Sequence, residues 1–142
     1  MSRQVVIDTN CLVQMISAHS PYRPAWQAFR EGLYTLCVSN DILNEYNEIL
    51  ERVANAVVAH NIVNAIVRSP YTRMLDPHFR FGLIEQDPDD NKFVDCAIIA
   101  GADYIVSEDA LVLPLAEVVV HALPRSEVLW NHAPLAACFE KI

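Results

Sequence analysis

Short apolar, β-branched runs alternate along this sequence with longer segments of helical periodicity. The first run, Val5-Val6-Ile7, is apolar throughout, which is typical of a strand buried on both faces of a parallel sheet. Further strands are predicted over residues 33–38, 103–107 and 118–120. Because parallel strands are joined by crossover helices, the alternation predicts an α/β fold with helices on both faces of the sheet.

Helices are predicted where apolar residues recur every three or four positions. The predicted helices cover residues 11–16, 24–32, 41–68, 87–101 and 126–130. The pattern is strongest over 41–68, where Ser39 is the predicted N-cap and Asn61 is a candidate break into two helices. The pattern is weak over residues 68–86, in which 83–84 form a candidate short strand.

Length and composition limit the class of protein. A chain of 142 residues, 53% hydrophobic and 20% charged, fits a single domain over residues 1–142 with a sizeable core. It shows neither a signal peptide nor an apolar run approaching the ~18 residues of a membrane span. The four cysteines form no CxxC pair, and the five histidines lack zinc-ligand spacing. We therefore expect a reduced, cytoplasmic protein with no membrane segment.

The net charge of −8 bears on the partner. Surfaces that bind nucleic acids are normally basic, so the charge argues against extended contacts with a nucleic acid. Carboxylates that gather in one site and are offset there by a metal ion would give the same net charge. Both interpretations stay open at this point.

Two aspartates are predicted at the carboxyl edge of the sheet. Asp8 directly follows the first predicted strand, and Asp109 lies two residues beyond Ser107, the end of another. Because ligands of open parallel sheets bind beyond the carboxyl ends of the strands, both are candidate site residues. For either residue alone, a turn or a helix cap is the competing interpretation, since Asp is common after strands.

Glu45 is a candidate because it borders the apolar stripe of the helix predicted over 41–68. It lies three residues after Ile42 and four before Ile49, whereas Glu48 and Glu51 point away from the stripe. A carboxylate in such a position must be paired, hydrogen-bonded or bound to metal, because burying it bare is unfavourable. The competing interpretation is an extended side chain at the rim of the core.

The acidic block that opens the helix over 87–101 supplies the next candidate. Acids in a first helical turn stabilise the helix dipole and need no metal for that. Asp90, however, begins a core-facing series that continues with Val94 and Ala97, while Asp89 faces solvent. Asp90 is therefore the preferred candidate, with Asp95 in reserve on the neighbouring face. Four carboxylates at one edge suit Mg²⁺, which takes oxygen ligands and, in pairs of ions, assists phosphodiester hydrolysis.

These segments together resemble the PIN-domain family. They are residues 5–10, the block Asp-Pro-Asp-Asp-Asn-Lys-Phe at 87–93 and residues 102–109, with Glu45 between them. The resemblance covers essentially the whole chain and is closest to the bacterial branch of toxin components of toxin–antitoxin systems. It implies a PIN-like three-layer α/β/α sandwich with a central parallel sheet, and Mg²⁺- or Mn²⁺-dependent endoribonuclease activity on RNA. An antitoxin protein and a homodimer are the further partners that it implies.

The resemblance also assigns residues to the site. The metal-binding acids that it implies are Asp8, Glu45, Asp90 and Asp109. Asn10 and Ser107 match polar residues that orient the carboxylates or the attacking water. The third acid of the family usually lies one residue nearer the final motif, where this chain has Asn91. Asp90, Asn91 and Asp95 therefore remain alternatives for that position.

Two other functions compete with the ribonuclease. A phosphatase with Asp8 as nucleophile is disfavoured, because Asn10 stands where a second Asp would act as general acid. A catalytically weak PIN-like binding or regulatory module is favoured by the shifted third acid and by the acidic net charge. Contacts with an RNA substrate would fall to basic residues, for which the candidates are Arg3, Arg23, Arg30, Lys92 and Arg125.

Overall fold

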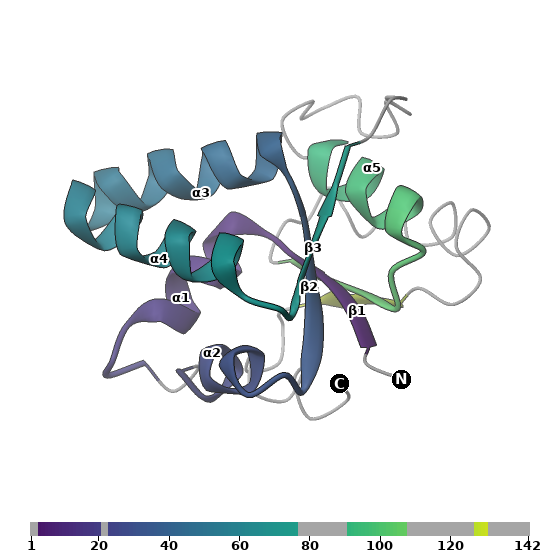
Figure 1. The fold of residues 1–142 in the computed structure, drawn as a ribbon, viewed down its shortest axis with the longest axis horizontal. Coiled ribbons are helices and arrows are strands. Elements are labelled where there is room, and N and C mark those ends of the chain that lie inside the picture. Colours follow the sequence, from purple (N-terminus) through teal and green to yellow (C-terminus); the bar gives the residue numbers. More distant parts are fainter. Residues whose placement is uncertain (1–2, 21–22, 77–90, 108–126, 131–142) are drawn as a thin grey trace.

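The computed structural model describes residues 3–20, 23–76, 91–107 and 127–130 (Figure 1). These residues contain five strands in one sheet of order β3-β2-β1-β4-β5, and every neighbouring pair is parallel. The strands are β1 (Arg3–Ile7), β2 (Tyr34–Ser39), β3 (Thr72–Leu75), β4 (Tyr104–Ser107) and β5 (Glu127–Trp130). The predicted parallel α/β fold is confirmed, whereas a single domain over residues 1–142 stays a prediction.

Helices cover both faces of this sheet. They are α1 (Thr9–Ile16), α2 (Arg23–Arg30), α3 (Asn40–Val53), α4 (Ala56–Arg68) and α5 (Asn91–Ala100). Helices α1 to α4 lie on one side and α5 lies on the other (Figure 1). The chain passes from β1 through β2 to β3 in one direction and then returns past β1 to β4, so right-handed crossovers place α5 on the opposite face. The result is the three-layer arrangement expected from the sequence. None of the helices in the described residues is long and apolar enough to cross a membrane.

The core lies on both faces of the central strand. Val5, Val6 and Ile7 of β1 are fully buried, as their uninterrupted apolar run predicts. Val94 and Ala97 of α5 are buried as well, but so are Phe93, Asp95 and Cys96, so burial does not single out the predicted core-facing side of that helix. Helix α5 ends before Gly101, which takes the left-handed φ of 61° that commonly follows a helix.

The long helical segment breaks at a different place from the predicted one. Ser39 caps α3 as expected, since its hydroxyl accepts a hydrogen bond from the backbone N–H of Ile42 at 3.3 Å. The break falls at Ala54 and Asn55, and the Asn55 side chain caps α4 by accepting from the N–H of Val58 at 2.8 Å. Asn61 lies exposed inside α4, so the candidate break there is wrong. An exposed Asn is tolerated within a helix, whereas a cap requires extended backbone, which Asn55 adopts.

Two short strands differ from the sequence-based prediction. Residues 127–130 form β5, not the predicted helix over 126–130, and they pair with β4 from Tyr104↔Glu127 to Ser107↔Trp130. Four residues are too few for periodicity to separate helix from strand, so pairing with a neighbour decides. Strand β3 lies in the segment whose pattern was weak. The candidate strands over 83–84 and 118–120, and the start of the helix predicted from 87, lie outside the described residues.

Candidate active site

The strand order reverses at the pair β1–β4, and the carboxyl ends of these two strands lie together. Ile7 of β1 is opposite Val106 of β4, and the N–H of Asp8 donates to the carbonyl of Val106 at 2.8 Å. Asp8 thus directly follows β1 at the sheet's switch point, and Ser107 is the last residue of β4 beside it. Open α/β sheets bind ligands in this position, outside the carboxyl ends of their strands.

Asp8 is the N-cap of α1, so the competing interpretation of this residue as a helix cap is correct. Its Oδ1 accepts a hydrogen bond from the backbone N–H of Asn10 at 3.1 Å, which caps α1. The residue is only 7% exposed. The positive end of the α1 dipole stabilises a carboxylate placed there. Capping therefore fixes this buried carboxylate at the carboxyl edge, which is compatible with a second role as a ligand.

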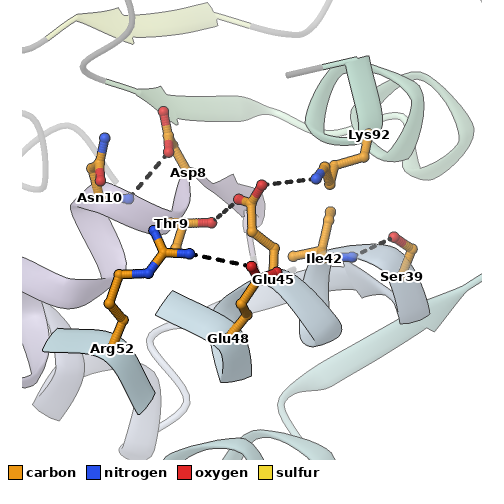
Figure 2. A network of polar contacts seen from close by, with 9 residues as sticks. All are labelled: Asp8, Thr9, Asn10, Ser39, Ile42, Glu45, Glu48, Arg52 and Lys92. Atoms are coloured by element: carbon orange, nitrogen blue, oxygen red, sulfur yellow. Dashed lines mark hydrogen bonds and ion pairs between the residues drawn. The ribbon is translucent and has the colours of Figure 1, made fainter. Parts of the chain in front are cut away.

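Glu45 comes to the same edge from α3, the helix that packs beside α1. Its side chain is 22% exposed, on the margin of the apolar face, as its spacing from Ile42 predicts. Figure 2 shows its carboxylate between Thr9 and Lys92. The Thr9 hydroxyl donates to Oε2, and the Lys92 ammonium donates to Oε1 at 2.8 Å. Since Thr9 directly follows Asp8, this contact ties Glu45 to the end of β1.

The two neighbouring acids of α3 behave as ordinary surface charges. Glu48 is 69% exposed and pairs with Arg52 at 3.3 Å, one turn along the same helix. Glu51 is exposed and accepts a hydrogen bond from Asn47. The predicted difference in exposure between Glu45 and these two acids is therefore confirmed.

Lys92 brings a positive charge to the edge from the first turn of α5. Its side chain is 18% exposed, and its ion pair with Glu45 links the helix on one face of the sheet to a helix on the other (Figure 2). Sequence reasoning had named Lys92 only among several basic residues. Its place next to an acidic block gave a weak hint, but the 47-residue separation from Glu45 hides the pair from local patterns.

Among the remaining candidate site residues, the structure describes Asp95 and Asn10. Asp95 is 2% exposed on α5, and a carboxylate so buried requires charged or hydrogen-bonding neighbours. Asn10 is exposed on α1. Asp90 and Asp109, and the side chains of Asn91 and Ser107, lie outside what the structure describes. Within the described residues, no three His, Cys, Asp or Glu side chains gather closely enough to hold a metal ion.

Tyr46 of α3 contacts the end of β1 beside the candidate site, and the sequence did not single it out. It is fully buried, and its hydroxyl donates a hydrogen bond to the carbonyl of Ile7, the last residue of β1. Burial raises the pKa of Tyr46 well above its ordinary value, and the charges of nearby groups, including Asp8, raise it further. The phenol therefore stays neutral and acts as a donor, which fixes the backbone immediately before Asp8.

The chemistry of the donors indicates what kind of cation could bind here. Asp8 and Glu45 offer carboxylate oxygens, and Thr9 adds a hydroxyl that contacts Glu45. Hard divalent cations such as Mg²⁺ and Mn²⁺ take oxygen ligands, so the residues present fit such an ion. Lys92 already neutralises part of the charge on Glu45.

A parallel sheet with carboxylates at its switch point is the architecture of a doubly wound α/β domain with a ligand site at its carboxyl edge. The PIN domain family model matches residues 4–111, a range that contains all four predicted acids, and the chain belongs to this family. PIN domains are generally nucleases and generally use divalent metal ions.

No match was found among curated proteins. A chain in the crystal structure of VapBC2 from Rickettsia felis, bound to a DNA fragment from their promoter, superposes with a TM-score of 0.56 at 13% sequence identity. The match covers 89% of this chain and 98% of that chain. At this level of identity the likeness shows a shared fold.

Proposed function

We propose that this protein is a divalent-metal-dependent endoribonuclease whose site contains Asp8 and Glu45. The observation that carries the proposal is the contact from Thr9 to Glu45, which joins the carboxylate of α3 to the end of β1 at the sheet's switch point. Membership of the PIN domain family supports the same chemistry. In this proposal Asp109 completes the site, and Asp90, Asn91 or Asp95 fills the third acidic position.

Each residue of the proposed site would have a distinct role. Asp8 and Glu45 would hold Mg²⁺ or Mn²⁺, which when bound supplies positive charge at the scissile phosphate and makes a water molecule more acidic. Thr9 would hold the Glu45 carboxylate next to the end of β1. Tyr46 would hold the end of β1 in place through the Ile7 carbonyl. Asn10 and Ser107 would orient the carboxylates or the attacking water.

The biological setting that we propose is a toxin–antitoxin pair in which this chain is the toxin component. The fold likeness to a chain of VapBC2 from Rickettsia felis supports this setting, as does the sequence resemblance to the toxin branch. An antitoxin protein would then be the physiological partner, and the chain would form a homodimer. Co-expression with the neighbouring open reading frame, followed by size-exclusion chromatography, tests both associations.

A second candidate function is a catalytically weak PIN-like binding or regulatory module. The observation that favours it is the ion pair between Lys92 and Glu45, because an internal ammonium can satisfy the carboxylate without a metal ion. The net charge of −8 also disfavours broad contact with RNA.

Cleavage of a mixed single-stranded RNA by the full chain separates the two functions. The assay compares Mn²⁺, Mg²⁺ and EDTA for the wild type, Asp8→Asn and Glu45→Gln, with Glu51→Gln as the matched control. Glu51 is exposed on the same helix, so its substitution removes an equal charge outside the site. We expect metal-dependent cleavage that disappears in both site variants and persists in the control. Cleavage that resists EDTA, or that both site variants retain, would contradict the ribonuclease, and a folded wild type that neither binds Mn²⁺ nor cuts RNA would favour the binding module.

A further inference from the structure

Both oxygens of the Glu45 carboxylate are engaged by donors of this chain. Oε1 accepts from the Lys92 ammonium at 2.8 Å, and Oε2 accepts from the Thr9 hydroxyl. The two charged side chains are partly exposed, at 18% for Lys92 and 22% for Glu45. Because most of each side chain is buried, neither charge can be left without a partner at low cost. An ammonium displaced from Glu45 would therefore need another anion nearby.

Among the described residues, Lys92 is the Lys or Arg side chain that lies at the carboxyl edge. Of the others, Arg3 begins β1, and three lie in the last turns of α2, α3 and α4, namely Arg30, Arg52 and Arg68. Arg23 and Arg73 donate to the backbone carbonyl groups of Ile16 and Ala100. The chain has a net charge of −8, which repels phosphate groups, whereas an ammonium at this edge attracts them.

We propose that Lys92 and a divalent cation compete for Glu45, and that Lys92, once displaced, binds a phosphate group of the RNA. The inference rests on the proposed ribonuclease. A divalent cation on Glu45 repels an ammonium that shares the same carboxylate, so Lys92 has to move when Glu45 takes the cation. The flexible four-carbon stem of Lys allows this movement, and its three donors suit a phosphate oxygen. Glu45 thus holds the phosphate-binding side chain until the cation releases it.

The proposal predicts effects of opposite sign from one substitution, Lys92→Met, which keeps an unbranched stem and removes the charge. Mn²⁺ affinity, measured by calorimetry on the full chain without RNA, should increase by about tenfold because the competing charge is gone. At saturating Mn²⁺, KM for single-stranded RNA should rise by about tenfold because a charged hydrogen bond to phosphate is lost. The slope of log affinity against log salt concentration should fall by about 0.7, the value for one phosphate contact on a single strand.

Arg68→Met is the matched control. Arg68 is exposed in the last turn of α4, which precedes β3 and so lies toward the amino ends of the strands. This control removes the same charge away from the site, and we expect neither Mn²⁺ affinity nor KM to change. Lys92→Arg, which keeps the charge, should leave the salt slope at the wild-type value.

Several outcomes would overturn the proposal. If Lys92→Met leaves Mn²⁺ affinity and KM unchanged while the wild type binds Mn²⁺ and cuts RNA, Lys92 is not a phosphate ligand and the ribonuclease still stands. If the substitution weakens both Mn²⁺ and RNA binding, Lys92 merely supports Glu45, and the competition is refuted. A wild type that neither binds Mn²⁺ nor cuts RNA overturns the ribonuclease and this inference together.

Discussion

Replacing Tyr46 with Phe tests how much one buried hydroxyl stabilises the end of β1. Tyr46 is fully buried, and its hydroxyl donates to the carbonyl of Ile7. The substitution keeps the ring but removes the hydroxyl, so the buried carbonyl of Ile7 loses this hydrogen bond and water cannot replace it. Leaving a buried acceptor unsatisfied costs about 1–3 kcal/mol. We therefore expect the free energy of unfolding to fall by that amount.

Urea titration followed by far-UV circular dichroism measures this difference. With a slope of roughly 1–3 kcal/mol per molar urea, the midpoint should fall by about 1 M while the slope stays the same. Tyr71→Phe is the matched control, because Tyr71 is 39% exposed and its hydroxyl can bond to water. We expect the control to leave the midpoint within experimental error.

The pH dependence adds a second readout of the same hydroxyl. Burial raises the pKa of folded Tyr46 above its ordinary value of 10.0, so the stability linked to its proton is complete below that value and is lost as pH rises through the folded pKa. The wild type should therefore lose its advantage over Tyr46→Phe only above about pH 10. Equal midpoints for Tyr46→Phe and the wild type at pH 7 would refute the hydrogen bond to Ile7, and an advantage that disappears below pH 9 would refute the buried, neutral phenol.

Two further predictions concern the backbone. Asn55→Ala should lower the free energy of unfolding by about 1 kcal/mol through loss of the α4 cap, whereas Asn61→Ala, inside the helix, should not destabilise the protein in the same urea titration; equal effects would contradict the observed break. Gly32→Ala should destabilise more than Gly101→Ala in thermal unfolding. Both glycines have positive φ, a conformation that costs an L-residue about 1–2 kcal/mol. Only at Gly32 would the new Cβ also lie 2.6 Å from the Tyr71 ring. Equal losses in Tm would show that the ring moves aside freely.

Local signals in the sequence were sufficient for the parts of the fold that depend on local physics. The apolar run of β1 predicted a strand buried on both faces, and Ser39 was identified as a cap from its place before a periodic segment. Helical spacing separated Glu45 from Glu48 because side chains three and four residues apart share a face. These features require only the chain within one or two turns of each residue, which explains why they could be predicted. The roles of the candidate acids stay predictions.

Features set by distant pairing could not be predicted in this way. Strands β3 and β5 have four residues each, and their conformation follows from ladders with β2 and β4 that no local pattern specifies. The same holds for the contacts from Tyr46 to Ile7 and from Lys92 to Glu45, which join residues 39 and 47 positions apart. Sequence reasoning placed the acids at one edge through the general rule for parallel sheets, but it had no means to find the ammonium among them.

The balance of charge at the carboxyl edge is what distinguishes the two proposed functions. Asp8 is stabilised by the N-terminus of α1, and Glu45 is paired with Lys92, so these two acids do not by themselves demand a cation. The proposed ribonuclease adds Asp109 and a third acid, and four carboxylates with one ammonium carry a net charge of −3. These like charges repel one another unless a divalent cation binds. A ribonuclease site should therefore bind Mn²⁺ in calorimetry, and Asp8→Asn or Glu45→Gln should weaken that binding, because each removes an oxygen ligand with its charge. A binding module whose acids are already balanced should bind Mn²⁺ weakly, and neither substitution should change its affinity.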